Sequence, residues 1–196
     1  MTQTPVKSSD LCLMSDMVAE IERTIARTTD EGGRASLEVY LAHVRAENEM
    51  DPEAAMRTMT PDGVSYFYGT IEGPRSVANK DRRQMYAVLM EAAPESWIYQ
   101  GFDDVRFVAD RDTLVHEGWL RVVVRGRSLP LWGGATPAGD DPDAFYEMRT
   151  RLLISVRMVE GLMDNEDVYF DFEKTYRKVE LDPAVVAAAV ARRKQA

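Results

Sequence analysis

Four long runs of apolar and aromatic residues fill the second half of this chain and constrain its fold most. They cover residues 97–108, 113–125, 145–159 and 164–172. In the second run, Leu114, His116 and Leu120 alternate with more polar positions such as Glu117, and this period of two is typical of a strand with one buried face. The separators at 109–112 and 160–161 are short enough for hairpins. We therefore expect long antiparallel strands, with the Gly/Pro/Asp-rich stretch 126–144 as a candidate lid.

The first half predicts helices instead. Apolar residues recur every three or four positions over residues 10–28, and Glu31-Gly32-Gly33 is expected to end that helix. A second helix is expected from Ser36, as N-cap, to Glu49, and a short third one after the N-cap Asp51. Further segments are a strand at 64–68, a helix at 77–93 and a C-terminal helix from 182 onward. This order predicts an α+β fold, a cone-shaped curved antiparallel sheet wrapped around helices.

Composition narrows the possible functions. A chain of 196 residues with net charge -9 can bury one substantial core and has no broad cationic face, so we expect no nucleic acid and no membrane surface as partner. The lone Cys12 and the two histidines predict neither a disulfide nor a metal site. No apolar stretch approaches the roughly 20 residues that cross a bilayer, and the amino terminus lacks the pattern of a signal peptide. We expect a cytoplasmic protein without cofactors.

Several local motifs, in order, resemble one superfamily. They are the segment 40–48 leading into 51–56, the segment 59–64, and Gly161 followed ten residues later by Asp171. In these motifs the chain resembles the nuclear transport factor 2-like superfamily. The resemblance is to its polyketide-cyclase-like (SnoaL-like), ketosteroid-isomerase-like and scytalone-dehydratase-like branch. The resemblance implies a domain at 36–180, preceded by a helical extension at 1–35 and followed by a C-terminal helix at 181–196.

The resemblance implies a cone whose cavity hosts cofactor-free acid/base chemistry in some members and simple binding in others. The ketosteroid-isomerase base has no counterpart in the strand 65–68, and the limonene-epoxide-hydrolase triad has none near Gly118, Leu120 or Val168. Tyr and His, which scytalone-dehydratase-like members use, are retained. This favours a dehydratase-type lyase acting on a hydroxylated aromatic or polycyclic small molecule, including retro-aldol loss of formaldehyde as in diarylpropane lyases. An isomerase, an aldol cyclase and a non-catalytic ligand-binding or dimerisation module are the alternatives.

The candidate catalytic residues are His116, Tyr66, Tyr68, Tyr40 and His43. An imidazole can transfer protons near neutral pH, and a phenol can bind an oxyanion, so His116 is the first candidate. Each of these residues also has a structural interpretation, as a satisfied strand histidine or as aromatic packing. The pattern leaves open which face of the strand 64–68 lines the cavity.

A second group is expected to bind the hydrophobic or aromatic substrate. It comprises Phe67, Lys80, Tyr86, Trp119, Leu120, Met148 and Phe170. Arg82 and Arg83, next to Lys80, are interpreted mainly as solvated surface, and the acidic stretch 164–167 as a polar hairpin exit. The extra amphipathic helix and the curved sheet favour a homodimer or homotrimer.

Overall fold

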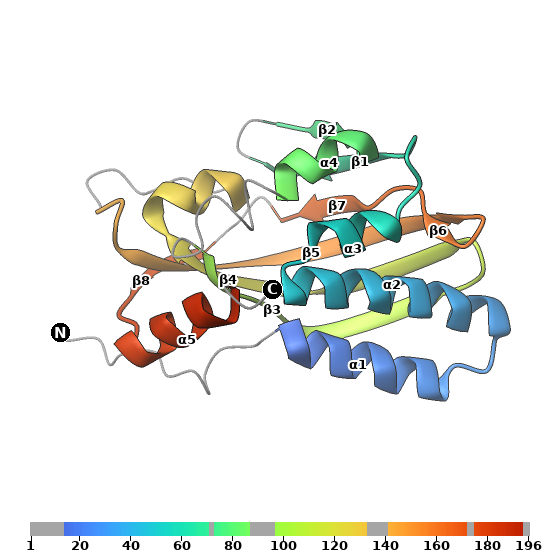
Figure 1. Ribbon diagram of the computed structural model, residues 1–196, viewed down its shortest axis with the longest axis horizontal. Helices are drawn as coiled ribbons and strands as arrows, with labels where there is room; N and C mark the ends of the chain where they lie inside the picture. Colours follow the sequence, from blue (N-terminus) through green and yellow to red (C-terminus); the bar gives the residue numbers. More distant parts are fainter. Residues whose placement is uncertain (1–13, 71–72, 87–96, 133–140, 172–174, 194–196) are drawn as a thin grey trace.

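A large curved sheet with helices packed against it forms the computed structural model, which describes residues 14–70, 73–86, 97–132, 141–171 and 175–193 (Figure 1). The helices are α1 (Met14–Arg27), α2 (Glu31–Glu49), α3 (Pro52–Arg57), α4 (Asn79–Tyr86), the 3-10 helix η3 (Gly126–Trp132) and α5 (Pro183–Arg193). The strands are β1 (Val64–Tyr68), β2 (Arg75–Ala78), β3 (Trp97–Ala109), β4 (Thr113–Arg125), β5 (Phe145–Val159), β6 (Leu162–Met163), β7 (Asp167–Phe170) and β8 (Thr175–Val179).

The sheet has the order β2-β1-β7-β5-β4-β3, and β6 and β8 also pair with β5. Strands β3, β4 and β5 are antiparallel neighbours, whereas β1 runs parallel to β7. The β3–β4 register shifts between Asp103 and Arg106, where Asp104 has a φ of 50°. Such a bulge bends a strand, which curves the sheet. The expected α+β fold with a curved, mainly antiparallel sheet is confirmed.

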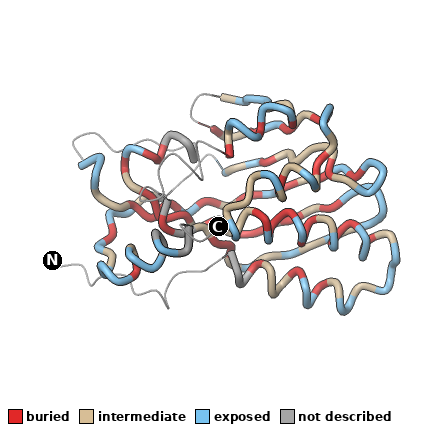
Figure 2. The backbone as a smooth tube through the Cα atoms, in the orientation of Figure 1, coloured by how far each residue is buried: buried red, intermediate tan, exposed pale blue. Residues whose placement is uncertain are grey.

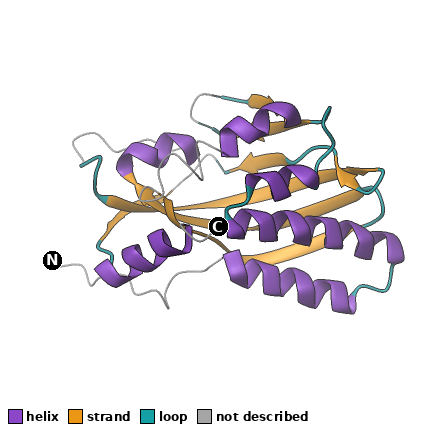
Figure 3. Ribbon diagram, in the orientation of Figure 1, coloured by secondary structure: helices purple, strands orange, loops and turns teal. Residues whose placement is uncertain are grey.

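Alternation of buried and more exposed positions along the long strands gives the sheet two different faces (Figure 2), and helices α1 and α2 lie across one of them (Figure 3). On the inner face, Leu114 and Val122 of β4 belong to the main core together with Leu37 and Val44 of α2. The outer face is turned away from α2, and there Val123 packs with α5 in a second, smaller cluster. Fully burying an aliphatic side chain contributes about 1.5–3 kcal/mol, so the inner face supplies most of the apolar stabilisation.

The start of α2 differs from expectation. Asp30 is the N-cap and accepts a hydrogen bond from the Gly33 N–H at 2.6 Å, so the helix runs straight through Gly32-Gly33. The two glycines are explained by the β3–β4 turn, since a Cβ on Gly33 would lie 2.5 Å from the Ala109 carbonyl oxygen. Ser36, expected as the cap, is buried one turn further on, where its hydroxyl donates to the Asp110 carbonyl at 2.7 Å. The glycine pair therefore marks a close approach and not a helix end.

The other helices and strands agree with the expected boundaries in some places and differ from them in others. The strands expected at 113–125 and 145–159 and the cap Asp51 are confirmed. Strands β2 and β8 were not expected, and the run 164–172 contributes only the short β7. The helix expected at 77–93 begins at 79, and its part beyond residue 86 lies outside the described residues, as do residues 133–140 of the candidate lid. Helix α2 spans the expected boundary at residue 35, and Met17 and Ile21 of α1 belong to the main core.

A hydrogen-bonded polar cluster inside the cone

Helix α2 presents three polar side chains to the inner face of the sheet. Tyr40, His43 and Glu47 follow at spacings of three and four, which place them on one side of a helix. Tyr40 is 1% exposed and His43 is 0% exposed, while the Glu47 side chain retains 20% exposure. Tyr86 from α4 and His116 from β4 join them, also buried. The cone thus contains a polar cluster surrounded by an apolar core.

His43 is held at both ring nitrogens. Its Nδ1 lies 2.7 Å from the Thr58 hydroxyl, which donates its own proton to the Ala55 carbonyl at 2.6 Å, so Nδ1 must be the donor. Its Nε2 lies 3.1 Å from the Tyr86 hydroxyl, which donates to Glu47 Oε1 at 2.9 Å, so Nε2 also donates. With Glu47 ionised, and with both hydroxyls donating as described, both bonds are satisfied together only by an imidazolium.

The electrostatics agree with that protonation state. Burial opposes a charge on His43, but the hydrogen bond and the negative charge of Glu47 outweigh it and raise the pKa of His43 above 6.5. Burial likewise opposes ionisation of Glu47, but His43 and the Tyr86 hydroxyl hold its pKa below the usual value. Burial raises the pKa of Tyr86 well above 10, so this phenol stays protonated. His43 and Glu47 therefore form an ion pair bridged by a phenol.

His116 has the opposite character. It is enclosed by the rings of Phe102 and Phe107, with centroids 4.9 and 5.1 Å from its own, and burial lowers its pKa to about 4, against a small opposing effect of Glu166. The Tyr40 hydroxyl lies 3.1 Å from its Nδ1. His116 Nε2 is buried and has no hydrogen-bond partner among the described residues.

The tautomer of His116 follows from counting partners. If Tyr40 donates to Nδ1, only the Nε2–H is left unpaired, whereas the reverse arrangement leaves both Nε2 and the Tyr40 proton unpaired. The first arrangement costs less because each unmade buried hydrogen bond costs about 1–3 kcal/mol. His116 is therefore neutral, and its unpaired Nε2–H is buried within the cone.

A buried ion pair completes the cluster. Arg82 of α4 is 0% exposed and its Nη1 lies 2.8 Å from Glu166 Oε2, whose side chain is 12% exposed. The backbone N–H of Glu166 donates to the Ser65 hydroxyl at 2.8 Å, which holds Glu166 against β1. The guanidinium also lies over the Phe67 ring, 5.7 Å from its centroid. Burial opposes the charge of Arg82, but Glu166 more than compensates, and its pKa is raised.

The structure brings together many of the residues expected from the sequence. Tyr40, His43 and His116 lie in the cluster, and Tyr86, expected only to bind substrate, bridges its ion pair. Four further expected binding residues are on the inner side, buried or packed against the main core: Phe67, Leu120, Met148 and Phe170.

Four expected residues lie elsewhere. Ser65 and Phe67 are the buried positions of β1, so Tyr66 and Tyr68 face the other way, and Tyr66 is 43% exposed. Lys80 is exposed on α4. Trp119 is on the outer face, beneath the guanidinium of Arg149 at 4.5 Å. Alternation along each strand separates these side chains from the cluster.

Three cluster members were not expected from the sequence. Glu47 had a signal, because an acid four residues after a histidine on one helix can pair with it. Arg82 was interpreted as surface because it stands in a run of charged residues, and Glu166 as part of a polar turn. Only their tertiary contact, between residues 84 positions apart in the sequence, identifies them.

Neither a metal site nor a membrane span is found in the described part of the chain. No three His, Cys, Asp or Glu side chains there converge as a metal site would require. No described helix is long and apolar enough to cross a bilayer.

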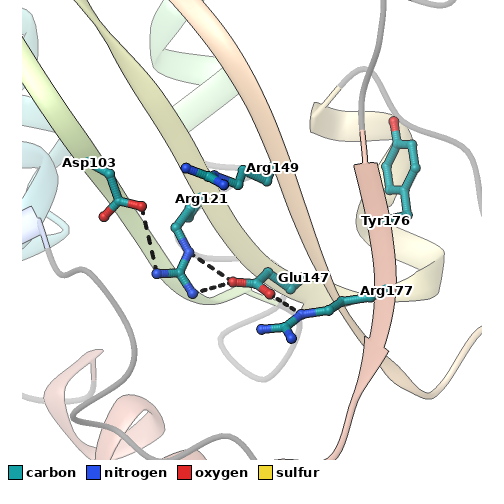
Figure 4. Close-up of a pocket in the computed structure, with 6 residues that line it drawn as sticks. All are labelled: Asp103, Arg121, Glu147, Arg149, Tyr176 and Arg177. Carbon is teal, nitrogen blue, oxygen red and sulfur yellow. Dashed lines mark hydrogen bonds and ion pairs between the residues drawn. The ribbon is translucent and has the colours of Figure 1, made fainter.

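The outer face carries a second polar group, which lines an open cavity of about 420 Å³ (Figure 4). Arg121 contacts both Asp103 and Glu147, and Arg177 contacts the other oxygen of Glu147. Arg149 stacks on Trp119. The two arginines that bind Glu147 keep its pKa below the usual value although burial opposes ionisation. Here Asp103 and Glu147 each pair with arginines, in a cavity that is open to solvent.

Comparisons with known proteins establish the fold. No family model matches the sequence, and no curated protein is significantly similar to it. A candidate SnoaL-like polyketide cyclase from Jannaschia sp. CCS1 is similar in structure, with a TM-score of 0.53 and 15% identity over 74% of this chain and 91% of that one. A candidate polyketide cyclase from Xanthomonas campestris pv. campestris gives a TM-score of 0.50 and 14% identity over 72% and 93%.

A third structure, a candidate SnoaL-like polyketide cyclase from Shewanella denitrificans OS-217, gives a TM-score of 0.51. Its sequence is 11% identical over 70% of this chain and 90% of that one. These similarities confirm the expected α+β fold with a curved, cone-shaped sheet, which this chain shares with the three candidate polyketide cyclases. At such low identity they show the fold and leave the activity to be argued from the site.

Proposed function

We propose that this protein is a cofactor-independent enzyme whose cone catalyses acid/base chemistry on a hydroxylated aromatic or polycyclic small molecule, with dehydration as its reaction type. The observation that supports this proposal is the buried polar cluster, in which one histidine is paired with a carboxylate, which raises its pKa, and the other is enclosed by aromatic rings, where burial lowers its pKa. Two such histidines do not stabilise a core, because burying a polar group opposes folding unless all of its hydrogen bonds are made.

His116 and Tyr40 form the electrophilic side of this mechanism. Tyr40 fixes the tautomer of His116, so the Nε2–H donates to a carbonyl oxygen of the substrate and stabilises the enolate that forms from it. In this tautomer His116 has no free lone pair to take a proton from the substrate, because its Nδ1 accepts from Tyr40 and its Nε2 carries the proton. We therefore transfer the role of proton carrier from His116 to His43.

His43, Glu47 and Tyr86 form the proton-transfer side. The Glu47 carboxylate takes a proton from the carbon beside the carbonyl, and the C–H electrons form the enolate and then the new double bond. The C–O bond to the leaving hydroxyl breaks, and the hydroxyl takes a proton that the His43 imidazolium supplies through Tyr86. A proton moving from Glu47 through the Tyr86 hydroxyl to His43 restores the ion pair, because Tyr86 contacts both groups.

An aldol cyclase is the second candidate, because three of the solved structures similar in fold are candidate polyketide cyclases. It shares the enolate step, after which the carbanion attacks a second carbonyl and no water leaves. Retro-aldol loss of formaldehyde, double-bond isomerisation and ligand binding without turnover are further outcomes that the same experiment separates.

The test is to incubate the purified protein, without metal or nucleotide, with a panel of aryl β-hydroxy ketones and hydroxylated polycyclic ketones. Dehydration predicts a new conjugated ultraviolet absorption and loss of the mass of one water. Cyclisation by aldol addition or isomerisation leaves the mass unchanged, and retro-aldol cleavage releases formaldehyde. Binding without any product contradicts the enzyme and favours the ligand-binding module.

A further inference from the structure

Arg82 has more hydrogen-bonding capacity than the described residues use. The side chain is fully buried, and its one ion pair, with Glu166, engages Nη1. Its Nε and Nη2 are buried and have no hydrogen-bond partner among the described residues. A buried donor that makes no bond costs the full desolvation of that group. A guanidinium with two such donors is thus explained best by a ligand that accepts from both.

The identity of the two unpaired atoms specifies the acceptor. In a planar guanidinium, the Nε–H and one Nη2–H point in parallel along the same edge, while Nη1 lies on the other side. Two parallel donors match the two oxygens of a carboxylate, the strongest form of charge-assisted pairing. Glu166 occupies the Nη1 side and leaves that edge to a second carboxylate.

The surroundings fit an aromatic acid. The Phe67 ring lies beneath the guanidinium, and Phe67 is 8% exposed, so a flat apolar wall adjoins the charged edge. Arg82 and Glu166 both influence the pKa of Tyr40, which places the ion pair near the proposed site. We propose that the substrate carries an aryl carboxylate, bound bidentately by Nε and Nη2 of Arg82. This inference rests on the proposed function and adds the substrate class.

The experiment uses the full chain and isothermal titration calorimetry near neutral pH. The probes are benzoate, 2-naphthoate and 9-anthracenecarboxylate, each paired with its uncharged primary amide. We expect at least one acid to bind about tenfold or more tightly than its amide, since a hydrogen bond to a charged group has roughly that effect. Equal affinity for acid and amide, or no binding of any acid, overturns the proposal.

Variants identify the responsible group. Arg82→Met should abolish the preference for the acid, whereas Arg177→Met, which removes the same charge from the outer face, should leave it unchanged. Because Arg82→Met leaves the carboxylate of Glu166 buried and unpaired, the double variant Arg82→Met/Glu166→Gln removes both charges together. A preference for the acid that survives in the double variant overturns the assignment to Arg82.

Glu166→Gln gives a test that keeps the guanidinium. It removes the competing negative charge, so the affinity for the acid should rise or stay equal, whereas a fall would contradict the proposal. The outcome is separable from that of the proposed function. Acid-selective binding without turnover supports this inference and contradicts the proposed enzyme. Turnover of neutral substrates without acid selectivity supports the proposed enzyme and contradicts this inference.

Discussion

The two faces of the sheet both carry arginines and carboxylates, but they use them differently. On the outer face Arg121 and Arg177 share Glu147 from two sides, with side chains that are 19% and 60% exposed. On the inner face Arg82 is fully buried, and among the described residues it has one carboxylate partner and two unpaired nitrogens. Water satisfies an exposed donor at little cost, so only the inner arrangement needs a ligand to explain it.

The comparison also extends to the histidines. Both lie on the inner side, yet one pairs with a carboxylate and the other with a phenol and two phenyl rings. Their pKa values therefore move in opposite directions from the same starting value. Pairs of titratable groups whose environments separate their pKa values are typical of acid/base sites.

The largest expected effect is on turnover. His43→Gln should lower kcat by about 10²–10⁴-fold, because that is the usual contribution of a general acid or base. The matched control is Arg177→Gln on the outer face, which should change kcat by less than about twofold, as expected for a residue outside the site. Similar losses of kcat in both variants would contradict the proposed functional difference between the two faces of the sheet. The measurement is steady-state kinetics on whichever substrate the ketone panel yields.

The next effect is on stability. Arg82→Met leaves Glu166 buried without its cation, and the free energy of unfolding should fall by about 3–5 kcal/mol. Arg177→Met should lower it by only about 0–1 kcal/mol, because the Arg177 side chain is 60% exposed and the buried Glu147 keeps its ion pair with Arg121. Urea titrations of the two variants measure the difference. Comparable losses in the free energy of unfolding would show that the inner ion pair contributes no more to stability than the outer one.

A third prediction concerns acid stability. Below pH 6.5 the unfolded chain binds a proton at residue 116, but the folded chain does so only near pH 4, so stability falls as the pH falls across this window. The full cost is about 3 kcal/mol. His116→Gln should remove this part of the pH dependence, which urea unfolding at neutral pH and near pH 4 can detect. Parallel curves for wild type and variant would argue against a desolvated His116.

The smallest effect tests a residue expected from the sequence to bind substrate. Trp119 lies on the outer face beneath Arg149 and Arg151. Trp119→Leu should leave KM within about twofold and lower stability by about 1 kcal/mol, the value of its cation–π contacts. A large rise in KM would mean that the outer face takes part in substrate binding. Kinetics and thermal unfolding of one variant suffice.

Sequence reasoning predicted the long strands because alternation is a local property, and β4 and β5 begin and end where the pattern does. It misplaced the start of α2 because Gly32 and Gly33 serve a contact with residues 109–111, which a local pattern does not contain. The short strands β2 and β8 were missed for the same reason, since partners elsewhere in the sheet define them.

The site was predicted in part. Tyr40, His43 and His116 were found because few residue types carry such chemistry and they fall on apolar faces. The strand pattern could not decide between Phe67 and Tyr66, because both are large and aromatic. Arg82 looked like surface because burial of a charge depends on a partner 84 residues away. The reversed roles of the two histidines likewise depend on contacts that only the fold creates.

The central claim is that the cone holds one cationic and one neutral histidine. Because the chain has two histidines, a nitrogen-15 NMR titration with the His43→Gln variant for assignment observes each ring separately. The account predicts that His43 titrates above pH 6.5 and that His116 stays neutral, with its proton on Nε2, until about pH 4. Two titrations near pH 6.5, or a His116 that becomes protonated before His43 as the pH is lowered, would contradict it.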